Sequence, residues 1–346
     1  MLLGLQGAEK FIRIAFKVIE AGEQPIGIIL VAPPGAGKSY LLTSFKGDGW
    51  VVCHDISGHG LETLMIEMSN RKTGYLVLPD MIRAFGRTNA RNSLFAVLNV
   101  ILEEGLTQIQ RSDVKFRFNE PVKFGFIGAI TTKEFLNRKK DMESVGLFSR
   151  CFVFSFKYTP EDTKRIVEYV SKNGLPKPDE RIPLEVDEIK PVVVDEVAEY
   201  IKNLGHLLAR LKNESFPFRS IKLIRKLVKG SARYCKRNKA TIEDIVQVYS
   251  FLPFLVYDAT DLDYRILTYI GKETILEKKE YVDYDEMTKK AKMYSEETIS
   301  KSLMNLHAKG FISIRKNKIT YGRIFYGEEM REANSYSNKE FQDNTL

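Results

Sequence analysis

The sequence predicts an α/β protein with a parallel sheet first, an all-helical unit second and a mixed unit of helices and strands last. Over residues 1–159, short apolar runs alternate with segments of helical spacing, which favours a parallel sheet covered on both faces. Over residues 160–257 helical segments follow one another without strands between them. Residues 258–327 again combine helical segments with strands. The polar residues 328–346 are typical of a disordered tail.

Length, hydropathy and cysteine content limit the classes of protein that fit. A chain of 346 residues suits two or three domains. No apolar run approaches the roughly 20 residues that a membrane span needs, and the first residues lack the pattern of a secretory signal. The 3 cysteines lie far apart, which argues against a disulfide framework or a metal cluster. We therefore expect a cytoplasmic protein with no membrane anchor.

The net charge of +8 is unevenly distributed. Residues 202–239 hold twelve Lys or Arg residues and one acid, Glu214. Such a basic block suits a polyanion such as nucleic acid. It is equally typical of a solvated helix face, and charge alone leaves both interpretations open.

Each core strand is predicted from a short apolar run. Continuous apolar runs suit strands that are buried on both faces, and we expect five, at residues 26–31, 50–56, 75–78, 124–130 and 151–156. Helical spacing predicts helices at 9–21, 60–69 and 90–104 in the first unit, and at 160–173, 193–212, 217–237 and 241–251 in the second.

A glycine-rich loop, Ala32 to Ser39, joins the first predicted strand to a helix that starts near Lys38. Backbone N–H groups of such a loop surround a β-phosphate, the lysine reaches the β- and γ-phosphates, and the Ser39 hydroxyl ligates Mg²⁺. We expect ATP and Mg²⁺ to bind here, through Pro34, Gly35, Ala36, Gly37, Lys38, Ser39 and Tyr40. A turn of this composition also joins strands to helices without binding a ligand, although the strand before it and the Lys-Ser pair favour phosphate.

A second group on the metal side is expected at the end of a neighbouring strand. Asp80 directly follows the apolar run at residues 75–78 and Pro79, so we expect it to hold Mg²⁺ through water. The alternative is that Asp80 only ends the strand.

The order of these elements resembles AAA+ ATPases over roughly residues 5–255. The resemblance implies that Thr131 or Thr132, at the end of the fourth core strand, is the sensor-1 residue that positions the attacking water. Arg150, in the triplet Ser-Arg-Cys, would be an arginine finger that reaches the γ-phosphate on a neighbouring subunit. Arg219 would be the sensor-2 residue that contacts the nucleotide from the helical lid. Each residue also has a purely structural alternative as a helix cap, a strand residue or a solvated charge.

The chain departs from the AAA+ pattern directly after Asp80. Relatives carry a water-activating Glu there, whereas this chain has Met81, and a thioether cannot deprotonate water. Glu103 and Glu104 are candidate substitutes. We therefore expect an ATPase in which nucleotide binding is better supported than rapid hydrolysis.

Residues 106–123 are predicted to form a hairpin before the sensor-1 strand. In this the chain resembles the Holliday-junction branch-migration motor and the minichromosome-maintenance helicases, whose hairpin touches DNA. The resemblance implies DNA contacts from Arg111, Lys115 and Arg117. A purely structural hairpin is the alternative.

Residues 262–326 are typical of a winged helix, with helices at 262–275, 284–293 and 296–309 and strands at 311–315 and 319–325. The third helix would enter a DNA groove and the wing would meet phosphate, which gives Thr298, Lys301, Lys316 and Lys318 as candidate DNA contacts. Winged helices also bind proteins. Origin-recognition ATPases share this order of core, lid and winged helix.

We therefore expect an ATP-binding AAA+ ATPase that self-associates into a ring or filament and acts on DNA, in replication initiation, as a helicase or in helicase loading. Two alternatives stay open. One is an ATP-dependent switch that recruits a protein partner, which the absence of the Glu favours. The other is a protein-remodelling chaperone.

Overall fold

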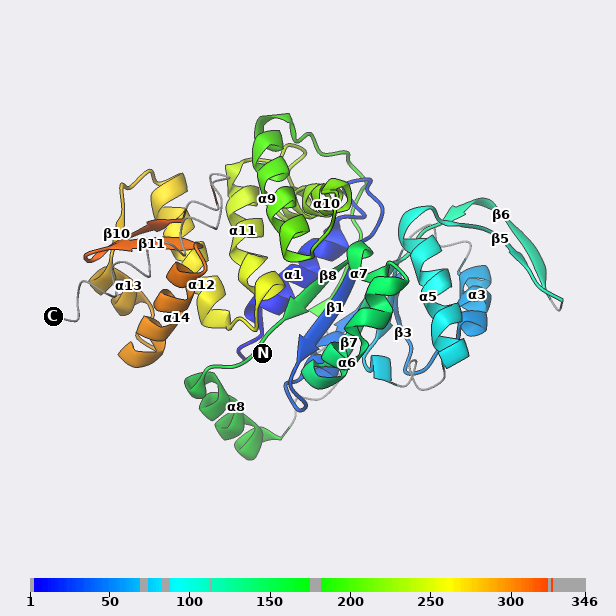
Figure 1. Ribbon diagram of the computed structural model, residues 1–346, viewed down its shortest axis with the longest axis horizontal. Helices are drawn as coiled ribbons and strands as arrows, with labels where there is room; N and C mark the ends of the chain where they lie inside the picture. Colours follow the sequence, from blue (N-terminus) through cyan, green and yellow to red (C-terminus); the bar gives the residue numbers. More distant parts are fainter. Residues whose placement is uncertain are drawn as a thin grey trace.

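The fold is seen in a computed structural model that describes residues 3–68, 74–82, 88–112, 114–174, 182–322 and 325 (Figure 1). Its centre is a five-stranded sheet in the order β3-β4-β7-β1-β8. All neighbouring strands of this sheet run parallel, which confirms the predicted α/β class. The strands are β1 (Gly27–Ala32), β3 (Trp50–Val52), β4 (Tyr75–Leu78), β7 (Gly125–Thr131) and β8 (Cys151–Ser155).

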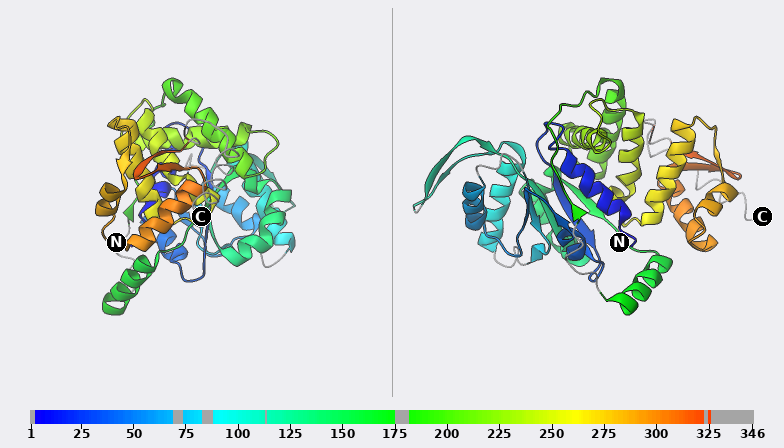
Figure 2. Two further views of the ribbon diagram at one scale, coloured as in Figure 1. Left: turned by 60° about the vertical axis from the view of Figure 1, so that its left-hand side comes forward. Right: turned by 180° about the vertical axis from the view of Figure 1, so that it is seen from behind.

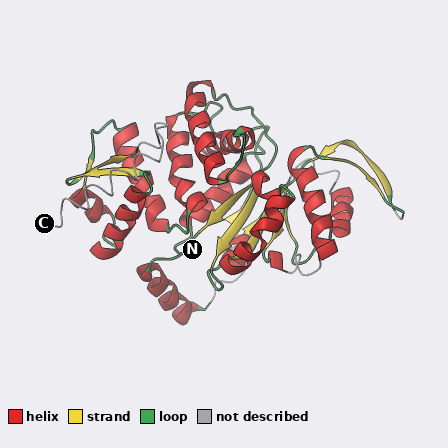
Figure 3. Ribbon diagram, in the orientation of Figure 1, coloured by secondary structure: helices red, strands yellow, loops and turns green. Residues whose placement is uncertain are grey.

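Both faces of this sheet are buried, because successive side chains of a strand point to opposite sides. On β1, Ile28 and Leu30 join one apolar cluster, whereas Ile29 and Val31 join the other. Helix α1 (Gln6–Lys17) belongs to the first cluster, and α3 (Gly58–Glu67) with α5 (Thr88–Glu103) to the second. Figure 3 shows helices on both sides of the strands. The other elements of this part of the chain are α2 (Lys38–Thr43), β2 (Phe45–Lys46), α6 (Thr132–Ser144) and α7 (Leu147–Arg150).

Four helices follow the sheet, namely α8 (Pro160–Asn173), α9 (Ala198–Leu211), α10 (Phe218–Tyr234) and α11 (Ile242–Val256). A short strand, β9 (Ile182–Pro183), pairs with β2, and a 3₁₀ turn at Asp195–Val197 precedes α9. Helix α10 packs against α1 and α9. Helix α8 instead projects from the body of the molecule (Figure 2).

Much of the basic block lies on α10, and two of its cations face acids rather than solvent. Lys229 Nζ lies 2.7 Å from Glu23 Oε1, and Arg233 Nη2 lies 3.9 Å from Glu20 Oε2. Both cations are largely buried. These ion pairs fix α10 to the loop after α1, so the block is only partly a solvated face.

The C-terminal unit contains three helices and a small antiparallel sheet in the order β10-β12-β11. Its elements are α12 (Asp261–Gly271), a π-helical turn at Lys272–Leu276, β10 (Val282–Asp283), α13 (Tyr284–Lys290), α14 (Glu296–Ala308), β11 (Ile312–Arg315) and β12 (Lys318–Tyr321). The two-residue strand β10 was not predicted, since so short a segment has no readable alternation. One apolar cluster extends from Leu5 in the first unit to Phe325 in the last, across the predicted domain boundaries. Those boundaries stay a prediction.

A β-hairpin of β5 (Leu106–Gln110) and β6 (Lys115–Val122) projects away from the sheet (Figure 1). It occupies the predicted position, directly before β7. Among the described helices, none combines the length and the apolar character needed to cross a bilayer. The predicted tail at 328–346 and residue Asp113 of the hairpin lie outside the described residues.

Candidate functional site

The loop after β1 has the backbone shape that its glycines allow. Gly35 and Gly37 have φ angles of 75° and 74°, in the left-handed region that favours glycine. Helix α2 begins at Lys38 with Gly37 as its N-cap, so no side chain caps its first N–H groups. The loop lies at the carboxyl end of a central strand, where open parallel sheets bind ligands.

The Lys38 ammonium is held at this loop by two backbone carbonyls. Its Nζ donates to the oxygens of Ala32 and Pro33, each at 2.8 Å, and the residue is only 8% exposed. Burial lowers the pKa of Lys38, and the charge of Asp80 acts in the opposite direction. The loop thus holds a cation beside uncapped N–H groups, an arrangement that suits a phosphate group.

Ser39, in the first turn of α2, and Asp80, after β4, meet at the same edge of the sheet. The Ser39 hydroxyl donates to the carbonyl of Pro79 at 2.7 Å, and Asp80 follows directly. The Asp80 side chain is exposed and accepts a hydrogen bond from the Ile82 N–H at 3.0 Å. A hydroxyl and a carboxylate are oxygen donors of the kind that Mg²⁺ takes, so the two residues fit that ion.

The two candidate sensor threonines lie at the carboxyl end of β7, next to the loop. Thr131 pairs in register with Ala32, and its hydroxyl caps α6 by accepting from the Glu134 N–H at 3.3 Å. The Thr132 hydroxyl oxygen is buried and has no hydrogen-bond partner among the described residues. The Thr132 hydroxyl is therefore unpaired, whereas the Thr131 hydroxyl accepts one hydrogen bond and keeps its O–H free to donate.

Met81 does not face the loop. It is 1% exposed, and a Cβ added to Gly128 of β7 would lie 2.2 Å from its sulfur. Its side chain fills the space over this glycine, within the apolar cluster that contains α5. A carboxylate at this position would enter that cluster rather than reach a phosphate.

Arg150 and Arg219 meet at the opposite end of the sheet, where they share one carboxylate. Arg150 Nη2 lies 2.6 Å from Glu103 Oε2, and Arg219 Nε lies 3.1 Å from Glu103 Oε1. Partial burial alone would raise the pKa of Glu103, but the hydrogen bonds and charges of the two arginines outweigh it and lower this pKa.

The position of this cluster of two arginines and Glu103 corrects two expectations about which residues act at the glycine-rich loop. Arg150 precedes Cys151, which pairs with Gly27 at the start of β1, whereas the loop follows Ala32 at its end. Five residues of strand separate the two ends by roughly 17 Å. Arg219 therefore does not contact a nucleotide at the loop of its own chain, and Glu103 is not placed to activate water there.

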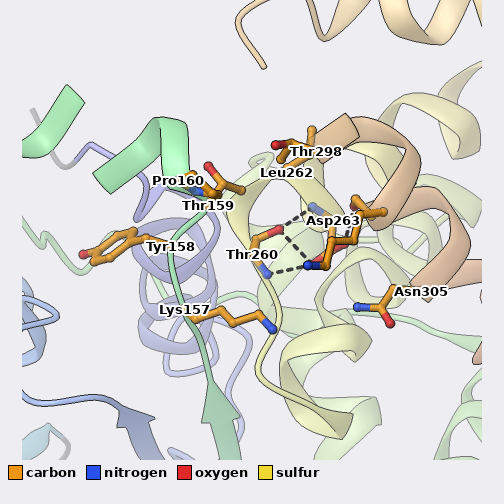
Figure 4. A pocket seen from close by; sticks show the side chains of 11 residues that line it. Lys157, Tyr158, Thr159, Pro160, Thr260, Leu262, Asp263, Thr298 and Asn305 are labelled. Atoms are coloured by element: carbon orange, nitrogen blue, oxygen red, sulfur yellow. Dashed lines mark hydrogen bonds between the residues drawn. The ribbon is translucent and has the colours of Figure 1, made fainter. Parts of the chain in front are cut away.

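One residue at the loop was missed by the sequence analysis. The Tyr158 hydroxyl donates to the carbonyl of Ala36 at 2.9 Å, and its ring lies against Gly4. Tyr158 also lines a cavity of about 260 Å³ between the end of β8, α12 and α14 (Figure 4). The segment Phe-Lys-Tyr-Thr-Pro after the last core strand offered only a helix cap at Thr159 as a signal.

The candidate DNA residues differ in their surroundings. On the hairpin, Lys115 and Arg117 are exposed, but Arg111 Nη1 lies 3.0 Å from Glu62 of α3. In the C-terminal unit, the hydroxyl of Thr298 donates to Glu161 at 2.8 Å, at the start of α14. Lys301 lines the cavity of about 260 Å³ beside Tyr158. Lys316 lies in the turn between β11 and β12, and Lys318 Nζ lies 3.9 Å from the centre of the Tyr281 ring.

In comparisons with known proteins, no protein-family model and no curated protein matches the chain.

Proposed function

We propose that this chain is a P-loop ATPase of the AAA+ type that binds ATP with Mg²⁺. The observation that carries the proposal is the loop itself. Gly35 and Gly37 have left-handed φ angles, Lys38 is buried beside the loop, and Ser39 lies next to the strand that ends before Asp80. Backbone N–H groups, one cation and two oxygen donors are the parts that a nucleotide triphosphate with its metal requires.

The sheet order supports the same proposal. Strand β7 lies between β1 and β4, so the threonines at its carboxyl end adjoin both the loop and Asp80. In the AAA+ family the sensor-1 residue works from this position. The buried, unpaired hydroxyl of Thr132 is suited to hold a water near a phosphate.

Each residue has a chemical role in this proposal. Lys38 neutralises charge on the β- and γ-phosphates, and the loop N–H groups orient them. Mg²⁺, held by the Ser39 hydroxyl and by Asp80 through water, would neutralise further charge on the phosphate oxygens. Arg150 lies at the far end of its own sheet, so it would act on a nucleotide held by a second copy of the chain. Self-association into a ring or filament is therefore part of the proposal.

DNA is the proposed substrate on which the ATPase acts. The helices α12, α13 and α14 with the sheet β10-β12-β11 support a winged helix. Lys115 and Arg117 on the hairpin and Lys316 in the turn between β11 and β12 are exposed and suit phosphates. Such contacts release counterions, so DNA affinity should fall steeply with added salt.

An ATP-dependent switch that recruits a protein partner is the second candidate function. The burial of Met81 favours it, because the position after Asp80 offers no water-activating group. A switch of this type would bind ATP tightly and hydrolyse it slowly.

The test of the nucleotide site is ATP affinity measured by calorimetry with Mg²⁺ present. Lys38→Ala should weaken ATP binding by at least about a hundredfold, because the phosphate charge loses its cation. Lys46→Ala is the control, since this exposed lysine lies beyond α2, and it should leave affinity unchanged. Equal dissociation constants for wild type and Lys38→Ala would refute the proposal.

A further inference from the structure

Two phenylalanines on either side of Pro217, at the start of α10, are the most exposed large apolar side chains among the described residues. Phe218 is 74% exposed and Phe216 is 69% exposed. Their rings lie parallel, with 2° between the planes and 5.9 Å between the centroids. Pro217 is the N-cap residue of α10, and its ring restricts the backbone between the two phenylalanines. The pair therefore presents parallel aromatic surfaces to solvent.

The packing of α10 does not account for this exposure. The residue before an N-cap often packs against the fourth residue of the helix, which here is Ile221. Ile221 instead lies against Gly205 of α9, and Phe216 stays exposed. Adjacent exposed apolar side chains mark a binding surface more often than isolated ones do.

The helix that begins at Phe218 is strongly cationic. Its 17 residues include no acid, and its cations are Arg219, Lys222, Arg225, Lys226, Lys229 and Arg233. Residues three and four positions apart are neighbours on a helix surface. Phe218, Lys222 and Arg225 are all exposed, so they form one row along the helix. An aromatic face at the end of this row thus adjoins two cations.

Nearby acids leave this row positively charged. Lys222 makes no ion pair and no side-chain hydrogen bond within the part of the chain that the structure describes. Arg225 Nη1 lies 3.3 Å from Glu23 Oε1, but ion pairs at a surface are weak and exchange readily. Glu214, the one acid of the basic block, accepts from the Ser220 hydroxyl at 2.9 Å instead. The row is therefore complementary to an anionic partner with flat rings.

We propose that Phe216 and Phe218 form a platform on which the bases of single-stranded DNA stack, while Lys222 and Arg225 meet its phosphates. Every base has an aromatic face, and proteins hold single strands by combining such stacking with cations along the backbone. In a duplex, the neighbouring base pairs cover these faces, so the platform favours a single strand. RNA offers the same faces and phosphates. That the strand is DNA rests on the proposed function.

The platform is tested with the full chain, without ATP, by fluorescence anisotropy at one fixed salt concentration. The probe is a labelled oligodeoxythymidine of about 20 nucleotides, longer than the ~4–16 nucleotides that single-strand sites cover. Phe218→Leu keeps an apolar side chain without a ring and should weaken binding at least about fivefold. Phe218→Tyr keeps the ring and should bind as wild type does. Leu136→Ala, which truncates a side chain on α6 that is 65% exposed, is the control and should have no effect.

An abasic strand of the same length separates stacking from phosphate contacts. It should bind equally to wild type and Phe218→Leu, because it has no bases to stack. Lys222→Gln should weaken binding of both strands and reduce the slope of log affinity against log salt by about one. Lys172→Gln, at the exposed end of α8, removes the same charge elsewhere and should leave this slope unchanged.

Two results would overturn the proposal. One is equal affinity of wild type and Phe218→Leu for the oligodeoxythymidine, which would assign the aromatic pair to a protein partner. The other is a loss in Phe218→Leu that persists with the abasic strand, which would show that the rings act on assembly and not on bases.

Two further ligands separate this proposal from the proposed function. Tighter binding of an oligouridine of the same length would overturn the choice of DNA as the strand. Binding of duplex DNA without any effect of Phe218→Leu on single strands would overturn the platform alone. If Lys38→Ala binds ATP as wild type does, the proposed ATPase fails, but a base-dependent loss in Phe218→Leu still supports the platform.

Discussion

The carboxylate of Glu161, in the first turn of α8, accepts a hydrogen bond from the backbone N–H of Ser295 at 3.0 Å. The hydroxyls of Ser295 and Thr298 donate to the same oxygen, at 2.7 and 2.8 Å. Slight burial would raise the pKa of Glu161, but these hydrogen bonds outweigh it and lower the pKa to about 2. One carboxylate thus occupies the start of α14, the end that a winged helix presents to DNA.

Removing this carboxylate should therefore expose the start of α14 to a DNA phosphate. Glu161→Ala should raise the affinity for duplex DNA by about fivefold or more, because a helix N-terminus attracts anions. Fluorescence anisotropy at one fixed salt concentration measures it. Glu168→Ala on the exposed side of α8 is the control for the loss of one negative charge. Equal affinities of the two variants would show that Glu161 does not compete with DNA.

Met81→Glu should destabilise the protein rather than activate it. The side chain at this position is buried against Gly128, so the carboxylate would lose its hydration without gaining a partner. We expect a loss of about 3 kcal/mol in the free energy of unfolding, measured with urea, and no increase in single-turnover ATP hydrolysis. Met81→Leu keeps the volume and should cost less than about 1.5 kcal/mol. A stable Met81→Glu chain with faster hydrolysis would contradict the observed side-chain direction.

Arg150→Ala should leave ATP affinity nearly unchanged and slow any turnover by up to about a thousandfold, since this arginine would act on a second copy. Mixing a small fraction of the variant into wild type tests the sharing directly. Turnover should fall more than in proportion to the fraction added, because each variant chain inactivates a neighbour's site. A strictly proportional decrease would mean that sites are not shared between copies.

Tyr158→Phe should weaken ATP binding by about fivefold, since one hydrogen bond of about 1 kcal/mol fixes the Ala36 carbonyl in the loop. Calorimetry measures the effect. Tyr169→Phe removes a hydroxyl on α8, away from the loop, and should have no effect. If both variants bind ATP as wild type does, the hydroxyl of Tyr158 does not shape the loop.

Features that depend on local pattern were predicted well. The five core strands were found because each is a short apolar run, although the run at 50–56 forms a strand only to Val52. The loop at Ala32 to Ser39 lies where it was expected, since glycines indicate a left-handed turn and a continuous apolar run indicates a buried strand. The helices and main strands of the C-terminal unit also agree with their spacing.

Features that depend on contacts between distant residues were not predictable. The separation of Arg219 from the loop follows from its ion pair with Glu103, 116 residues away. Arg111 looked like a free basic residue of the hairpin, yet it bonds Glu62 on α3. Whether Met81 faces the loop or the core depends on Gly128 in a neighbouring strand. Residue type and spacing carry no information about such partners.

The hydrogen bond from the Gly7 N–H to Asp261, at 2.7 Å, joins residues 254 positions apart and bears on how the chain is made. At about 5–20 residues per second, a ribosome needs roughly 10–50 s to synthesise that interval. Helix α1 leaves the ribosome early, while its partners α10 and α12 have yet to be translated. Its apolar residues Phe11 and Ile14 would be exposed meanwhile. The nascent chain is therefore vulnerable to aggregation at this helix until α10 and α12 are made, and a chaperone that covers the helix should raise the yield of folded protein.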